Sequence, residues 1–118
     1  MSRKKDNFVP FPEYFTLTNG KEKRFIRKGA SMMRSKQYIE LSATAKVIFD
    51  YMALEAGREK HFIFPYSACE EQMSKNTFFR ARNELIEAGF ITVVENNANL
   101  RKPNVYSFSS KWKYKKLL

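Results

Sequence analysis

Apolar residues recur at a helical period over residues 41–56. They fall three or four positions apart on one face, at Leu41, Ala45, Ile48, Phe49, Met52 and Ala56. This spacing predicts a helix that buries that face, capped by Ser42 and ended by Gly57. A second apolar stripe lies at Val47, Tyr51 and Leu54. A helix that is apolar on two sides is expected at the centre of the fold, with the N-terminal segment packed over one side.

A second strong helical pattern covers residues 75–88. Ser74 can cap it, Gly89 can end it, and its buried stripe is expected at Phe78, Ala81, Leu85 and Ala88. A shorter helix is predicted just before it, at residues 68–73. There Ser67 and Glu70 have the spacing of a capping box. The segment therefore predicts two helices joined by a tight turn.

Strand-like runs lie at residues 61–64, 90–95 and 104–109. The last two flank a polar, asparagine-rich loop at residues 96–103, which predicts an antiparallel hairpin. Toward the N-terminus, residues 14–17 are β-prone and precede an Asn19-Gly20 turn, and residues 30–39 suggest a short helix. The expected fold class is α+β: a three-helix core with a helix-turn-helix, a hairpin, and an extra N-terminal segment.

The length and composition fit one small domain. The chain has 118 residues, of which 43% are hydrophobic, enough to build a core. Residues 1–11 read as a flexible basic arm, because Pro10 and Pro12 disfavour a helix. Residues 12–110 read as the domain and residues 111–118 as a basic, aromatic tail.

The net charge of +10 is unevenly distributed. Residues 1–36 carry ten basic and three acidic side chains, residues 37–72 three and six, and residues 73–118 nine and three. Basic ends around an acidic middle indicate one anion-facing side. This favours nucleic acid as the partner first, and an anionic membrane surface second.

Several other classes of protein find little support. No apolar run of about 18 residues suggests a membrane span. The single cysteine, Cys69, and the single histidine, His61, have no partners at metal-ligand spacing, and no glycine-rich phosphate loop is present. We therefore expect no enzyme, no metal and no cofactor. A chain with one cysteine also suggests an intracellular, cytoplasmic protein.

The best candidate site is the outward face of the helix at residues 75–88. Asn76, Arg80 and Asn83 share one stripe of it. Arginine can bridge guanine O6 and N7, and asparagine can bridge adenine N6 and N7, in a DNA major groove. Lys75 and Thr77, at the start of the helix, are expected to reach phosphates.

Two side chains of this helix have more than one interpretation. Phe79 should point outward, where it can cover the turn, contact a thymine methyl group or pack on a second subunit. Arg82 adjoins the buried stripe, so either its stem packs while its head reaches solvent, or it meets an acidic partner.

Three further segments are candidates for contact with nucleic acid. The hairpin tip carries Asn97, Asn99, Arg101 and Lys102, and the N-terminal arm carries Arg3, Lys4 and Lys5. The tail alternates lysines with Trp112 and Tyr114, which can stack on single-stranded bases. For Trp112 we favour partial packing on the core.

The stretch SKNTFFRARNELIEAGFI (residues 74–91) resembles the signature of a winged helix-turn-helix, and LSATAK (residues 41–46) resembles the start of its first helix. The resemblance covers about residues 12–110. It is nearest to the winged-helix domain of replication initiators and related regulators on plasmids and conjugative elements of Gram-positive bacteria. It implies a double-stranded DNA-binding protein, often dimeric, whose third helix enters the major groove. An RNA or single-strand binder and a winged-helix protein-interaction module remain the alternatives.

Overall fold

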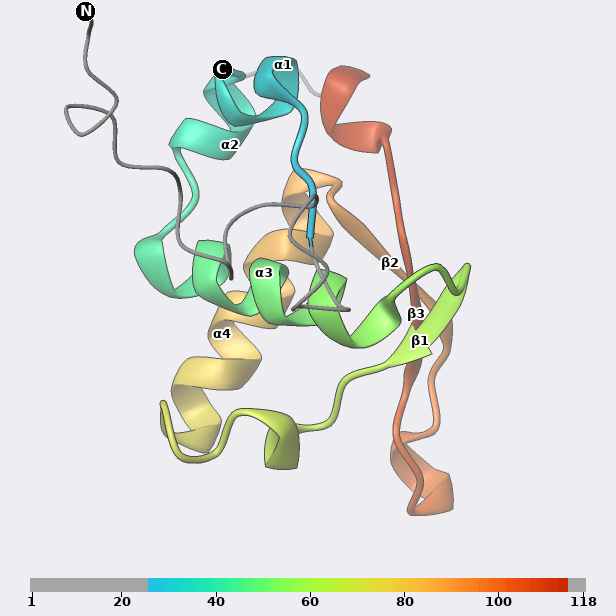
Figure 1. Ribbon diagram of the computed structural model, residues 1–118. Coiled ribbons are helices and arrows are strands. Elements are labelled where there is room, and N and C mark those ends of the chain that lie inside the picture. Colours follow the sequence, from blue (N-terminus) through green and yellow to red (C-terminus); the bar gives the residue numbers. More distant parts are fainter. Residues whose placement is uncertain (1–25, 115–118) are drawn as a thin grey trace, which may run out of the picture.

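The computed structural model describes residues 26–114, which form an α+β fold (Figure 1). Two long helices, α3 (Ala43–Ala56) and α4 (Lys75–Ala88), pack against one another beside a small sheet. Two one-turn helices precede them, α1 (Ala30–Met33) and α2 (Lys36–Ile39). The arrangement is compatible with a winged-helix layout.

The sheet contains three antiparallel strands in the order β1–β3–β2. They are β1 (His61–Ile63), β2 (Ile91–Glu95) and β3 (Val105–Phe108), which confirms the three predicted strands. Phe62, Tyr106 and Val93 form one row across the sheet, with the first two buried on the side of the helices. The predicted hairpin is β2–β3, whose connection includes the short 3-10 helix η3 (Ala98–Leu100).

Both long helices have the predicted ends. The Ser42 Oγ accepts a hydrogen bond from the Ala45 N–H at 3.1 Å, and the Ser74 Oγ accepts one from the Thr77 N–H at 3.2 Å. Gly57 follows α3, and Gly89, in a left-handed conformation with φ 89°, follows α4. All six residues of the stripe predicted for α3 are buried: Leu41, Ala45, Ile48, Phe49, Met52 and Ala56. Of the four residues of the stripe predicted for α4, Phe78, Ala81 and Leu85 are buried and Ala88 is half-buried.

Aromatic rings join the two helices to the rest of the core. Phe90 is fully buried and meets Tyr38 and Phe49 edge-on, at 6.0 and 5.5 Å between ring centroids. Trp112, in the 3-10 helix η4 (Lys111–Tyr114), stacks on Phe90 at 5.7 Å with an interplanar angle of 8°. The tail therefore packs on the core through Trp112, as the sequence predicted.

The helix predicted at residues 68–73 is wrong. Only the 3-10 helix η2 (Tyr66–Ala68) forms there, and turns follow it up to Ser74. The backbone leaves the helical region at Cys69, whose side chain is buried, and the Tyr66 hydroxyl donates a hydrogen bond to the Met73 carbonyl at 2.8 Å. Tertiary contacts therefore overrule a capping pattern too short to hold a helix alone.

The single helix expected over residues 30–39 is divided in two at Ser35. The Ser35 Oγ donates to the Met32 carbonyl at 2.6 Å and accepts from the Tyr38 N–H at 3.1 Å. One serine thus ends α1 and caps α2, since its side chain serves both as donor and as acceptor.

The second apolar stripe of α3 is only partly covered by described residues. Val47 is exposed, whereas Tyr51 and Leu54 are half-buried. The N-terminal cover predicted for this stripe, the arm at residues 1–11, the β-prone run at residues 14–17 and the Asn19-Gly20 turn all lie outside the described residues. No helix within residues 26–114 is long and apolar enough to cross a membrane.

A carboxylate from α4 holds the start of α3. Glu84 accepts from the Ser42 N–H at 2.6 Å through Oε2 and from the Ser42 hydroxyl at 2.7 Å through Oε1. The negative charge also lies at the positive end of the α3 dipole. These two bonds fix the contact between the two long helices at one point.

Replacing Glu84 with alanine is expected to lower the free energy of unfolding by about 1–2 kcal/mol, because two charge-assisted hydrogen bonds are lost. Urea denaturation followed by circular dichroism measures the change. Glu87→Ala, at an exposed position in the last turn of the same helix, is the control and should leave stability nearly unchanged. Equal effects of the two substitutions would show that the bonds from Glu84 to Ser42 do not stabilise the fold.

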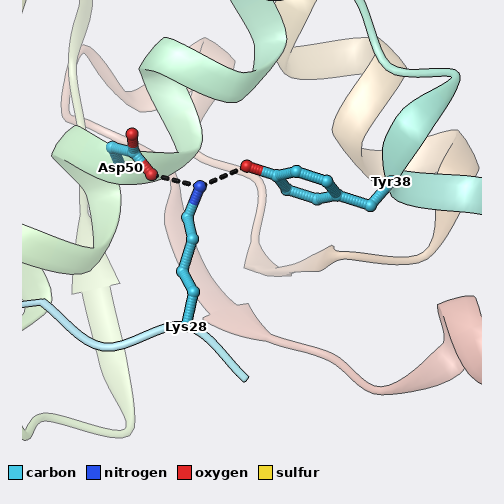
Figure 2. Close-up of polar contacts among 3 residues, drawn as sticks. All are labelled: Lys28, Tyr38 and Asp50. Carbon is cyan, nitrogen blue, oxygen red and sulfur yellow. Dashed lines mark hydrogen bonds and ion pairs between the residues drawn. The ribbon is translucent and has the colours of Figure 1, made fainter. Parts of the chain in front are cut away.

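Lys28 anchors the segment before α1 to the middle of α3 (Figure 2). Its ammonium forms an ion pair with Asp50 and donates a hydrogen bond to the Tyr38 hydroxyl. It also lies over the rings of Tyr38 and Phe49, at 4.7 and 5.6 Å from their centroids. Burial alone would lower the pKa of Lys28. The hydrogen bonds to Asp50 and Tyr38 and the charge of Asp50 raise this pKa by more than burial lowers it, so the pKa lies above its ordinary value of 10.5.

Lys28→Met is expected to lower the free energy of unfolding by about 1–2 kcal/mol at pH 7. Since the pKa of Lys28 is raised in the folded protein, its contribution is fully present below pH 10.5 and is lost as the pH rises through the folded value. Denaturation at pH 7 and pH 11 should therefore show a smaller difference between wild type and variant at the higher pH. Lys36→Met, at an exposed lysine of α2, should show little difference at either pH.

Candidate nucleic-acid interface

The start of α4 and the tip of the β2–β3 hairpin lie at the same end of the molecule in Figure 1. The topology explains this, because α4 runs away from that end, Gly89 reverses the chain, and β2 runs back toward it. Two segments that carry candidate contact residues are thus presented toward one side.

The outward face of α4 is polar and basic over its first two turns. Lys75, Asn76 and Arg80 are exposed there, and so is Asn83 one turn later. Thr77 is half-buried, and its Oγ1 accepts a hydrogen bond from the Ser74 hydroxyl at 3.0 Å. Of the six predicted residues of this helix, Thr77 is therefore the least available to a ligand.

Within the first half of α4, no acidic side chain offsets this charge. The first turn contains no acid, and the first acid along the helix, Glu84, is bound to Ser42, the N-cap of α3. The free backbone N–H groups at a helix N-terminus add positive potential. The first half of α4 therefore forms a surface suited to a polyanion.

Phe79 and Arg82 pack against one another on the flank of α4. Phe79 is 38% exposed, and its ring meets Phe78 edge-on at 5.2 Å between centroids. The Arg82 guanidinium lies 4.9 Å from the centre of the Phe79 ring. Its Nη1 donates to the Tyr106 hydroxyl of β3 at 3.5 Å. Arg82 thus packs its head on an aromatic ring and bridges α4 to the sheet.

Arg82 also binds the next residue in the chain. Its Nε and Nη2 both donate to Oδ1 of Asn83, at 3.3 and 3.0 Å. The sequence placed Arg82 beside the buried stripe but did not include it, or Tyr106, among the site residues. No local pattern indicates the contact between Arg82 and Tyr106, because the two residues lie 24 positions apart in the chain.

The hairpin tip is held by its asparagines, and this corrects the prediction for one of them. Asn97 is only 6% exposed, so it does not present its side chain to a ligand. Its N–H donates to Oδ1 of Asn104 at 2.7 Å, and its Nδ2 donates to the Pro103 carbonyl at 2.8 Å. The buried amide instead satisfies backbone and side-chain groups within the loop.

The other predicted residues of the tip, Asn99, Arg101 and Lys102, are exposed. Arg101 has a left-handed backbone conformation, with φ 56°. The turn that Asn97 stabilises thereby places two adjacent positive charges at the end of the hairpin. The N-terminal candidates Arg3, Lys4 and Lys5 lie outside the described residues.

Further features of the described residues are a buried thiol and an open groove. Residues 26–114 contain no cluster of three or more metal-ligating side chains of the His, Cys, Asp or Glu type. Cys69 is buried, and burial, followed by the charge of Glu70, raises the pKa of its thiol. One open groove of about 420 Å³ lies between the starts of α3 and α4, lined by Ala43, Thr44, Val47, Gln72, Met73 and Thr77.

Comparison of the chain with protein-family models found no match, and neither did comparisons with curated proteins and with solved structures. The function is therefore inferred from the side chains that α4 and the hairpin expose.

Proposed function

We propose that this protein is a winged-helix protein that binds double-stranded DNA. The observation that carries the proposal is the first half of α4, a capped helix whose exposed face holds Lys75, Asn76 and Arg80 and which contains no acid before Glu84. A major groove is wide enough to admit a helix, and its base edges match arginine and asparagine side chains. In this pose Lys75 contacts a phosphate and Arg80 contacts a base.

The hairpin supplies a second contact in the same pose. Its tip carries the exposed Arg101 and Lys102, and the tip lies at the end of the molecule where α4 begins. Two adjacent cations on a rigid turn suit a phosphate backbone or a narrow minor groove. The wing therefore orients α4 and adds affinity with little reading of sequence.

The proposed biological role is regulation of transcription or replication on a plasmid or another mobile element, in a bacterial cytoplasm. This part rests on the resemblance of residues 74–91 to winged-helix regulators. A homodimer on a two-fold symmetric site fits the same resemblance, since dimers bind half-sites about one helical turn apart.

Fluorescence anisotropy tests the proposal with three labelled probes: a random duplex, a single strand and a structured RNA, each over a salt series. Tight duplex binding that weakens steeply with salt is expected, because bound cations release counterions from the DNA. Absence of duplex binding even at low salt would overturn the proposal. Preference for RNA or for the single strand would favour that alternative, and binding of none of the probes would favour a protein-interaction module.

One observation weakens the single-strand alternative. One face of Trp112 is stacked on Phe90, so this ring is not free to stack on a base from both sides. Tyr114 remains 81% exposed beside Lys113. A stacking role for the tail would therefore depend on Tyr114.

Deleting residues 1–5 is expected to weaken binding to every duplex alike and to reduce the salt slope, because Arg3, Lys4 and Lys5 can contribute phosphate contacts only. Each lost contact should lower the slope by about 0.9. Anisotropy titrations of the full chain and the truncated chain, at several salt concentrations, measure both quantities. An unchanged slope would show that the arm does not touch the DNA.

A further inference from the structure

The two hydrogen bonds from Arg82 determine which part of Asn83 faces outward. Both bonds converge on Oδ1, at 3.3 Å from Nε and 3.0 Å from Nη2. A guanidinium has five N–H donors and no acceptor, so the group that it binds must be the carbonyl oxygen of the amide. The chemistry of the pair thus identifies oxygen and nitrogen of the Asn83 amide.

Arg82 is itself held in place by contacts on two other sides. Its guanidinium lies over the Phe79 ring and donates to the Tyr106 hydroxyl of β3. Arg82 is half-buried, whereas Asn83 is exposed. The arginine therefore acts as a support that spans α4 and the sheet, and the asparagine is the side chain that a ligand meets.

The Asn83 oxygen already accepts from two N–H groups of the positively charged Arg82 guanidinium, so it is a poor acceptor for a third donor. The two N–H groups of Nδ2 are what Asn83 offers to a ligand. An asparagine that bridges adenine must accept from N6 while it donates to N7, and the engaged oxygen of Asn83 disfavours the first of these bonds. Adenine then offers Nδ2 only N7, next to the N6 donor, whereas guanine offers two acceptors on its major-groove edge and thymine offers O4.

We infer that Asn83 is a donor-only specificity residue that selects guanine or thymine, and that Arg82 is the positioning residue that prevents it from reading adenine. This inference rests on the proposed function. It differs from the general expectation for asparagine, which still applies to Asn76 on the first turn of α4.

The test is selection of binding sites from a random duplex library by three proteins: wild type, Asn83→Ala and Arg82→Met. Methionine keeps an apolar stem at residue 82 but removes every donor. Thermal denaturation confirms that each protein is folded. Asn76→Ala is the matched control, because it should relax the preference at a different base position.

The expected result is that one position selected as guanine or thymine by the wild type loses its preference, by about tenfold, in Asn83→Ala. In Arg82→Met the same position should shift toward adenine, since the freed carbonyl can then accept from N6. Should Arg82→Met fail to fold, the comparison of wild type with Asn83→Ala decides: an Asn83-dependent guanine or thymine supports the inference.

Three outcomes would overturn it. The wild type could select adenine at the Asn83-dependent position, Asn83→Ala could weaken all sequences equally, as a phosphate contact would, or a folded Arg82→Met could leave the preference unchanged. In each of these cases duplex binding itself persists, so the proposed function stands. Failure of the wild type to retain any duplex would instead overturn the proposed function, and this inference with it.

Discussion

Replacing Arg80 with alanine is expected to weaken binding to the selected DNA site by about 1–3 kcal/mol, or roughly 5- to 150-fold, and to relax the preference at one base position. Arg80 is exposed on the second turn of α4, in the same stripe as Asn76 and Asn83. A guanidinium at this place can donate two parallel hydrogen bonds to guanine, and alanine can donate none. Binding to random duplex should fall much less, because only one positive charge is lost.

Anisotropy titrations with the selected site and with random duplex measure both effects of this change. Arg58→Ala is the matched control, since it removes the same charge at an exposed position that follows α3. It should reduce binding to both duplexes slightly and equally. If Arg80→Ala behaved in the same way as Arg58→Ala, the assignment of α4 as the recognition helix would be wrong.

Replacing Gly89 with alanine is expected to lower the free energy of unfolding by about 2–4 kcal/mol, from backbone strain and overpacking together. Gly89 has φ 89°, a conformation that side chains disfavour. An added Cβ would lie 2.6 Å from the Trp112 backbone nitrogen and 2.9 Å from the Lys111 carbonyl carbon. The Trp112 N–H also donates to the Gly89 carbonyl at 3.1 Å, so the two segments cannot easily separate.

Urea denaturation of wild type, Gly89→Ala and Gly29→Ala tests this prediction. Gly29 has φ −70° and no heavy atom within 4 Å of the position of a Cβ, so its substitution is a matched control with little expected effect. Wild-type stability of Gly89→Ala would show that the tail does not pack on this junction. Because Gly89 joins α4 to β2, the substitution should also alter how the helix and the hairpin are presented to DNA.

Parts of the interface could be predicted because they depend on neighbours in the chain. The exposure of Lys75, Asn76 and Arg80 follows once Phe78 and Leu85 are placed in the core, since a helix repeats every 3.6 residues. The identity of their ligand does not follow from exposure. Contact of Arg80 with DNA therefore stays a prediction.

Other parts could not be predicted, because their partners are distant in sequence. No pattern in the sequence assigns a role to Glu84, whereas in the structure it binds Ser42, the N-cap of α3, from 42 positions away. Asn97 read as a polar tip residue, whereas the loop folds back and uses its amide at Pro103 and Asn104. In both cases the pattern shows that a side chain is polar, but not which group will meet it.

The sequence by itself determined the two long helices, the three strands and the buried stripes. Caps such as Ser42 and Ser74, the left-handed stop at Gly89 and the apolar periods act within a few residues, so they are readable from the chain. Only the tertiary structure decided that a 3-10 helix and then turns replace the helix predicted at residues 68–73, and that Arg82 binds the carbonyl oxygen of Asn83. These outcomes depend on Tyr66, Cys69 and Tyr106 finding partners in the folded core, and such contacts exist only after the helices and strands have packed together.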